Sequence, residues 1–367
     1  MKVGIITMHK VQNIGSALQT YALQYKIESL GYDAETIDYM NIPEEPKPSF
    51  QHRVLSFFFD LFSGFPSQKM EQRFSVFYER FYKCSEKQYS RNNIDSNPPF
   101  YDVYCTGSDQ VWNPGYIKDD INYMLNFAPD GMRRISYASS FATNLIPLQY
   151  KNIYSKALAK YDFITVREAS GVKIVRELTD ITPNVVCDPT LLLSASEWNK
   201  IADTSTFNVK GRYILVYLLG YMYDPRPGIF NIIKSVQKGM GLPVIYVNGG
   251  YQEMLQPKSR VFRGLGPVEF LSLVKNASFI VTDSFHGTAF ATLYNLPMLG
   301  VVKDRNTSDG RLTTLRNTVG GEKSIIGCNE ELDFDPNNID AYRCDSTLLK
   351  EYVNHSESML NQMLRGV

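Results

Sequence analysis

The segment TDSFHGT, at residues 282–288, is the strongest candidate for a catalytic site because it places a histidine between a predicted strand and a predicted helix. The apolar run at 279–282 indicates a buried strand. His286 would then lie at the carboxyl end of that strand, where it could donate or accept a proton near neutral pH. The backbone N–H groups of Gly287 and Thr288 could hold an anion at the start of the helix. A histidine satisfied by structural contacts is the alternative.

A second candidate site follows the first predicted strand. Asn13, Gly15 and Ser16 stand between an apolar run at 3–7 and a helical pattern at 16–30. A helix start offers N–H groups and the positive end of a dipole, and glycine permits close approach of a ligand. We therefore expect a ligand contact here. The alternative is a capped helix, with Asn13 or Ser16 as the cap.

A polar loop, TGSDQVWNP, follows the predicted strand at 102–106. Polar loops at the carboxyl ends of strands are usual binding sites in open α/β sheets. We expect this loop to bind the hydroxyls and the ring face of a sugar through Ser108, Asp109, Gln110 and Trp112. The alternative is a turn in which Asp109 is a cap and Trp112 belongs to the core.

Cationic side chains follow two further strands. Arg167 could grip a carboxylate or phosphate with two parallel hydrogen bonds, or could form a structural pair with an acidic residue. Lys303, Arg305 and Arg311 form a basic loop that could cover a negatively charged donor, or could be solvated. Asp188 is expected to be structural, as a turn former or as the partner of an arginine.

The elements that must position these residues alternate between apolar runs and helical patterns, which is typical of parallel α/β domains. We predict an α/β protein with two Rossmann-like domains facing a cleft, a GT-B-like architecture. The predicted domains are an acceptor-side domain at 1–204, with a helical insertion at about 50–90, a donor-side domain at 205–330 and a mostly helical extension at 331–367. The insertion includes VLSFFFDLFSGF. Helices covering the sheet are favoured there over a lipid-facing surface, which would need a basic polar face.

Composition excludes several classes of protein. The 367 residues include 38 basic and 38 acidic side chains, which argues against a nucleic-acid partner. Five cysteines without a C-x-x-C spacing and four separated histidines predict no disulfide framework and no metal site. No apolar stretch reaches the ~18 residues of a membrane span. We expect a cytoplasmic protein and leave its oligomeric state open.

Five segments, in chain order over about residues 1–320, resemble the polysaccharide pyruvyl transferase family: NIGSALQTYALQYKIESLGY, TGSDQVWNP, TVREASGV, VVCDPTLLL and TDSFHGTAFATLYNLP. The resemblance implies a GT-B-like fold. It also implies transfer of a carboxyethylidene group from phosphoenolpyruvate, the co-substrate, to a sugar, forming a pyruvate ketal with no other cofactor. The implied acceptor is a surface polysaccharide or its lipid-linked oligosaccharide precursor, which would bring the protein to the inner face of the membrane.

The resemblance also implies roles for individual residues. His286 matches the catalytic histidine of the family's Arg-x-His motif, and Arg167 resembles an arginine that binds phosphoenolpyruvate. His286 would act as an acid or stabilise the leaving phosphate, while Asp109 and Gln110 would orient the sugar. Where the family has arginine two residues before the histidine, this chain has Ser284.

A serine at position 284 would lie in the donor site but cannot supply a charged fork. Either one of four basic residues replaces the missing arginine, or the donor differs; the four are Arg263, Lys303, Arg305 and Arg311. Two alternative functions therefore stay open. One is a GT-B glycosyltransferase that uses a nucleotide sugar, and the other is a non-catalytic carbohydrate-binding relative.

Overall fold

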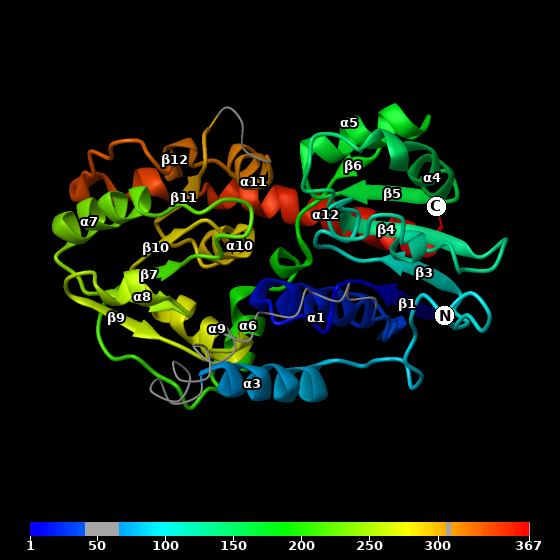
Figure 1. Cartoon of the computed structure of the whole chain (residues 1–367), viewed down its shortest axis with the longest axis horizontal. Helices are drawn as coiled ribbons and strands as arrows, with labels where there is room; N and C mark the ends of the chain where they lie inside the picture. The colour runs from blue at the N-terminus through cyan, green and yellow to red at the C-terminus, as the bar shows by residue number, and fades with distance from the viewer. Residues whose placement is uncertain (41–65, 306–309, 367) are drawn as a thin grey trace, which may run out of the picture.

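Two parallel six-stranded sheets form the two lobes of the molecule (Figure 1). The computed structural model describes residues 1–40, 66–305 and 310–366. The first sheet consists of β1 (Lys2–Ile6), β2 (Asp33–Thr36), β3 (Val103–Thr106), β4 (Arg133–Ser139), β5 (Phe163–Val166) and β6 (Asn184–Val185). The second consists of β7 (Ile214–Tyr217), β8 (Val244–Val247), β9 (Ser259–Phe262), β10 (Phe279–Thr282), β11 (Met298–Val302) and β12 (Ile325–Gly327). The predicted two-domain α/β class is confirmed.

The strand orders locate the places where ligands usually bind. The first sheet has the order β2-β1-β3-β4-β5-β6, and the second has β12-β11-β10-β7-β8-β9. The order therefore reverses between β1 and β3 and again between β7 and β10. Open α/β sheets bind ligands outside the carboxyl ends of strands at such reversals. The loops after β1, β3 and β10 carry many of the predicted site residues, whereas Arg167 follows β5 and the basic loop follows β11.

Helices cover the faces of both sheets because each central strand is buried on both sides, as the fully buried β10 shows. The α-helices are α1 (Ile14–Ser29), α3 (Pro66–Phe81), α4 (Leu148–Leu158), α5 (Ala169–Leu178), α6 (Ala195–Ala202), α7 (Gly228–Met240), α8 (Tyr251–Met254), α9 (Pro267–Asn276), α10 (Phe285–Leu293), α11 (Arg311–Val319) and α12 (Ser346–Arg365). Four short 3₁₀ helices are η1 (Ile121–Met124), η2 (Pro189–Leu191), η3 (Glu322–Ser324) and η4 (Pro336–Tyr342).

Local sequence signals fix several of these helix ends. Ser194 and Glu197 form a reciprocal capping box at the start of α6, in which each side chain accepts the backbone N–H of the other. Helix α7 ends at Gly241, whose φ of 67° is the left-handed conformation that glycine adopts without strain.

Two helices tie the lobes together. Helix α12 follows the second sheet in the chain but returns to the first lobe, where Ser356 Oγ accepts the Cys187 N–H at 2.9 Å (Figure 1). Helix α3 belongs to the predicted insertion, and its Arg73 guanidinium lies 3.1 Å from Glu269 on α9. Its Phe74 and Phe77 are buried, so this aromatic face is covered by the protein. The apolar segment 54–65 lies outside the described residues.

An apolar core runs continuously from the first lobe into the second. At its centre Trp198 of α6 packs edge-on against Tyr21 of α1 and Phe290 of α10, with ring centroids 5.7 and 5.2 Å apart. The starts of α1 and α10 are thereby held against each other by buried hydrophobic contact. Among the described residues, no helix has the length and apolar content needed to cross a membrane.

Candidate functional site

His286 lies at the junction of the two lobes, in the first turn of α10. Ser284 caps this helix, because its Oγ accepts the Gly287 N–H at 3.3 Å. The imidazole is nearly buried, with 7% of the side chain exposed. It packs against the first turn of α1, where a Cβ on Gly15 would overlap the ring. Glycine at position 15 is therefore required for this close approach between the lobes.

Asp188 is the acceptor on which the polar side chains of the junction converge. Its Oδ2 accepts Arg167 Nη1 and Ser108 Oγ, each at 2.9 Å, and lies 3.5 Å from His286 Nε2. Its Oδ1 accepts the Thr190 N–H and hydroxyl. Burial opposes ionisation, but the neighbouring imidazole and guanidinium hold the pKa of Asp188 well below its usual value. Asp188 is thus a buried carboxylate shared by residues of both lobes.

Arg167 is buried but lacks a full set of hydrogen-bond partners. Its guanidinium lies over the Phe285 ring, 4.2 Å from the centroid. Its Nη1 bonds Asp188, whereas Nε and Nη2 have no hydrogen-bond partner. Glu168 Oε2 and His286 Nε2 are unpartnered in the same place. Together they make four of the ten buried unpartnered side-chain atoms among the described residues. Such a concentration of unmet polar atoms indicates a site that a polar ligand completes.

Glu168 connects this cluster to a neighbouring loop of the first lobe. Its Oε1 accepts Ser140 Oγ and the backbone N–H groups of Phe141 and Ala142. Burial raises the pKa of Glu168, against the opposing effects of Arg167 and Arg311. The next residues of this loop, 143–145, form one wall of a cavity.

That cavity has a volume of about 340 Å³ and is lined by both lobes. Lys303 and Arg311 contribute cations to it, and Asp283 contributes a carboxylate. Asp283 accepts the backbone N–H groups of Leu219 and Gly220, and burial raises its pKa. The volume falls in the range of small-molecule sites, ~300–1,000 Å³. The loop residues 143–145, which directly follow the Ala142 N–H bound by Glu168, place this cavity beside the buried cluster.

The second-lobe predictions are corrected at four residues. The Gly287 N–H is occupied by the Ser284 cap, and both the N–H and the hydroxyl of Thr288 donate to the Ser284 carbonyl. The N–H groups of these two residues and the Ser284 side chain therefore form hydrogen bonds within α10 and are not available to bind an anion. Arg305 is not brought to the site, because it pairs with Glu330 at 2.8 Å on the surface.

The first-lobe predictions are corrected in the same way. Trp112 is completely buried against Phe141 and Tyr161, so the prediction that it stacks on a sugar is wrong. Ser108 is also completely buried and donates to Asp188, so it is not available to an acceptor.

The remaining first-lobe residues have partners within the protein. Asn13 caps α1, so the alternative interpretation of this segment as a capped helix is confirmed. Ser16 donates to Asp109, which has a left-handed φ of 72° and is buried. Gln110 is partly exposed and accepts Asn113. Of the predicted acceptor residues, Asn13 and Gln110 are partly exposed, whereas Ser16, Ser108, Asp109 and Trp112 are buried.

The structural role predicted for Asp188 is confirmed, because it caps η2 and pairs with Arg167. The sequence analysis did not single out two tyrosines on the rim of the junction. Tyr116 and Tyr221 are 43% and 62% exposed. They come from different lobes and lie near one another, and the Tyr221 side chain bonds Asn13. Tyrosines with an exposed ring and a polar tip suit carbohydrate binding. The many tyrosines in the composition were the available signal, but they do not identify which ones meet.

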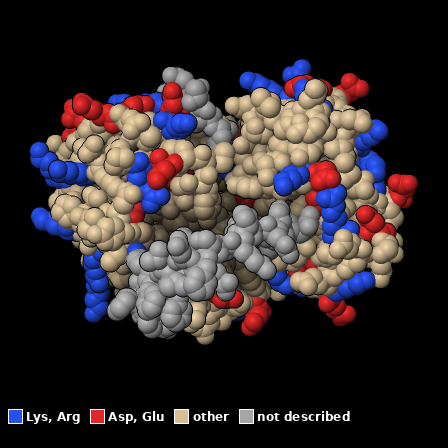
Figure 2. Space-filling view, viewed as in Figure 1, with Lys and Arg blue, Asp and Glu red and all other residues tan. Residues whose placement is uncertain are grey.

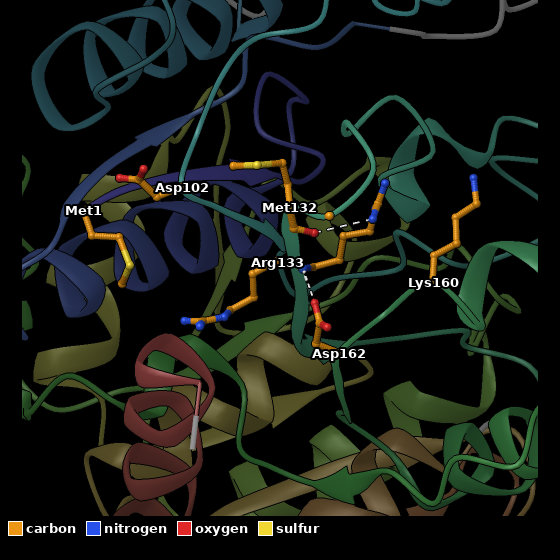
Figure 3. A pocket seen from close by; sticks show the side chains of 8 residues that line it. Met1, Asp102, Met132, Arg133, Lys160 and Asp162 are labelled. Carbon is orange, nitrogen blue, oxygen red and sulfur yellow. Dashed lines mark hydrogen bonds between the residues drawn. The ribbon is translucent and has the colours of Figure 1, made fainter.

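The opposite edge of the first sheet carries a different cavity, of about 460 Å³, at the amino ends of its strands (Figure 3). Its cations serve the fold. Arg133 donates to the Leu364 carbonyl of α12, and buried Arg134 donates to the Ala128 carbonyl. Asp162 accepts the backbone N–H of Arg134 at 2.8 Å, and the labelled Arg133 side chain extends away from it. Across the described ranges, no His, Cys, Asp and Glu side chains group in a way that could hold a metal ion.

Charges of both signs are interspersed over the face that includes the junction (Figure 2). Fold and site together define a two-domain, GT-B-like α/β protein with its polar cluster between the lobes. The chain belongs to the polysaccharide pyruvyl transferase family, whose model matches residues 13–304. Family membership indicates a transferase with a sugar or polysaccharide acceptor. No curated protein matches the chain.

Solved structures support the fold. The UDP-GlcNAc 2-epimerase of Methanocaldococcus jannaschii, in complex with UDP-GlcNAc and UDP, has a TM-score of 0.54 at 14% identity, over 100% of both chains. The MnaA–UDP structure of S. aureus has a TM-score of 0.51 at 13% identity, over 98% of this chain and 97% of that one. At such identities the likeness extends to the arrangement of the two lobes and not to the ligands.

Proposed function

We propose that this protein transfers the pyruvyl group of phosphoenolpyruvate to a sugar of a surface polysaccharide or its lipid-linked precursor, forming a pyruvate ketal. The observation that carries the proposal is the buried Arg167, with two N–H-bearing nitrogens unpartnered beside His286 and Asp188. Phosphoenolpyruvate has a carboxylate and a phosphate, and a guanidinium fork matches the planar carboxylate with two parallel hydrogen bonds.

Two of the four basic residues that could replace the missing arginine have partners elsewhere. Arg305 is paired on the surface, and Arg263 donates to the Gly249 carbonyl. Lys303 and Arg311 instead line the cavity beside the cluster. In our proposal these two cations attract the phosphate, while Arg167 binds the carboxylate. Phe285 and His286 must shift slightly from the Arg167 guanidinium to admit the donor, because its nitrogens are covered.

The remaining groups have separate roles. Asp188 orients His286 and Arg167 together, so that the donor's leaving phosphate meets an imidazole held in place. His286 then delivers a proton to the phosphate as it departs. The acceptor sugar lies on the rim, against Tyr116, Tyr221 and Gln110, from which its two hydroxyls reach the donor.

The experiment is calorimetric titration of the purified protein with phosphoenolpyruvate, beside a parallel titration with UDP-GlcNAc. Arg167→Lys keeps the charge but removes the fork, and Arg305→Lys is the matched control at a surface pair. We expect saturable binding that is weakened roughly 10-fold or more in Arg167→Lys, because a hydrogen bond to a charged group contributes ~1.5–3 kcal/mol. Binding should be unchanged in Arg305→Lys.

The outcomes separate the alternatives. Binding of UDP-GlcNAc without phosphoenolpyruvate would establish the glycosyltransferase alternative in place of this proposal. Lack of binding by either ligand would favour a non-catalytic relative. Equal affinities in the wild type and Arg167→Lys would remove Arg167 from the donor site.

A further inference from the structure

The two carboxyl oxygens of Glu168 have unequal surroundings. Oε1 accepts three donors, Ser140 Oγ at 3.0 Å and the Phe141 and Ala142 N–H groups at 2.9 and 3.2 Å. Oε2 has no hydrogen-bond partner and lies 4.0 Å from Arg167 Nε, which also has none. A protonated carboxyl accepts through its carbonyl oxygen and donates through the other. Oε1 is therefore occupied by donors, and Oε2 is the oxygen from which a proton could pass to a ligand.

Several groups around Glu168 favour its ionised form, among them the hydrogen bonds from Ser140 and Ala142. Arg167 at the same strand end and Arg311 of α11 both favour the carboxylate, and Tyr352 of α12 lies close by. Burial is the largest influence and it outweighs these cations, so the pKa of Glu168 is raised. The side chain is completely buried. A raised pKa favours the protonated form, which a general acid needs.

We propose that Glu168 is the catalytic acid that protonates the methylene carbon of phosphoenolpyruvate, an inference that rests on the proposed function. With the donor's carboxylate on Arg167 Nε and Nη2, its methylene would lie next to Glu168 Oε2. The Oε2–H bond breaks, and the alkene electron pair forms the new C–H bond. The neighbouring carbon becomes an oxocarbenium-like centre.

The remaining protons and bonds balance. The first sugar hydroxyl forms a C–O bond to the cationic centre and gives its proton to the Glu168 carboxylate, which restores the acid. The second hydroxyl forms the other C–O bond as the C–O bond to phosphate breaks. His286 takes the proton of this hydroxyl and passes it to the leaving phosphate. Glu168 and His286 thus serve different proton transfers.

Infrared difference spectroscopy in D2O tests the protonation directly. We expect the wild type at neutral pH to show a protonated-carboxyl band that is absent from Glu168→Gln. Asp283→Asn is the matched control, because Asp283 is a second buried carboxyl with a raised pKa; its substitution should leave the Glu168 band in place. If Glu168→Gln does not fold, ¹³C-glutamate labelling of the wild type should shift the band, and an unshifted band overturns the proposal.

Proton transfer itself is followed by ¹H NMR of phosphoenolpyruvate in D2O, with the protein and a mixture of methyl glycosides. We expect deuterium to enter the methylene position in the wild type and to do so ~100-fold more slowly in Glu168→Gln, with unchanged affinity for phosphoenolpyruvate. A purely structural Glu168 would alter affinity and exchange together. No exchange in the wild type, or equal rates in both proteins, overturns the proposal.

Failure of this inference can be told apart from failure of the proposed function. A wild type that does not bind phosphoenolpyruvate overturns the proposed function, and this inference with it. A wild type that binds phosphoenolpyruvate while Glu168 is ionised overturns this inference alone.

Discussion

The two lobes bring carboxylates of opposite character to their junction. Asp188 of the first lobe accepts Arg167 and faces His286, and these partners lower its pKa. Asp283 of the second lobe accepts the backbone N–H groups of Leu219 and Gly220, and burial raises its pKa. Its partners thus hold Asp188 ionised, whereas burial favours the protonated form of Asp283, as it does for Glu168 in the first lobe. A carboxylate's position after a strand does not determine its charge; its partners do.

The largest expected effect is that of Asp188→Asn. Removing the carboxylate leaves the Arg167 guanidinium as an unpaired buried charge, which should cost ~3–5 kcal/mol of unfolding free energy at neutral pH. Urea denaturation followed by tryptophan fluorescence measures it, because both tryptophans are buried.

The pH dependence of this cost has a definite sign. The folded-state pKa of Asp188 lies below its unfolded value, so its stabilisation is present above the ordinary aspartate pKa of about 4 and is lost as the pH falls further. The gap between wild type and Asp188→Asn should therefore narrow in acid. A gap below ~1 kcal/mol at neutral pH would contradict the description of Asp188 as a buried ion-pair partner.

The next effect concerns the steric contact between the lobes. A Cβ at position 15 would overlap the His286 ring, so Gly15→Ala should destabilise the protein by ~1–3 kcal/mol, as overpacking does. The double variant with His286→Ala should recover most of this cost, since the ring that clashes is gone. The unfolding free energies of the four proteins form a double-mutant cycle. Strictly additive costs would mean that the two residues do not meet.

A smaller effect is expected for Asp283→Asn. An asparagine can accept one of the two backbone N–H bonds, so we expect a loss of ~1 kcal/mol. The pKa of Asp283 is raised on folding, so its contribution is full below the unfolded pKa and falls as the pH rises through the folded one. The cost of Asp283→Asn should therefore shrink with rising pH, whereas that of Asp188→Asn grows. Urea titrations at several pH values measure both costs. If the two costs changed with pH in the same direction, Asp188 and Asp283 would not differ in the way described.

Much of this arrangement could be predicted from the sequence. Uniform apolar runs such as FIVT at β10 indicate buried parallel strands, and the loops that follow them contain the site residues. The half-exposed edge strand β9 has no such run, so the pattern does not reveal it. Within the loops, the sequence gives residue types but not partners.

Partners explain the errors at the site. Trp112 and Arg305 have the right chemistry for ligand contact, yet one fills the core and the other pairs with Glu330. Asp188 has the sequence features of a turn former, and it does cap η2. Its contacts with Arg167 and His286 join segments 21 and 98 residues away, by subtraction of their numbers. The spacing of residues within one segment cannot show which distant residues Asp188 contacts.

The smallest expected effect is that of Arg305→Ala, which contrasts an exposed arginine with the buried Arg167. Arg305 and Glu330 side chains are 48% and 44% exposed, so solvent screens their attraction. Exposed pairs contribute ~0–1 kcal/mol, and we expect a change within that range together with unaltered binding of phosphoenolpyruvate. Urea denaturation and calorimetric titration measure the two quantities. Loss of donor binding in this variant would mean that Arg305 leaves Glu330 to contact the donor, and the distinction between the two arginines would then fail.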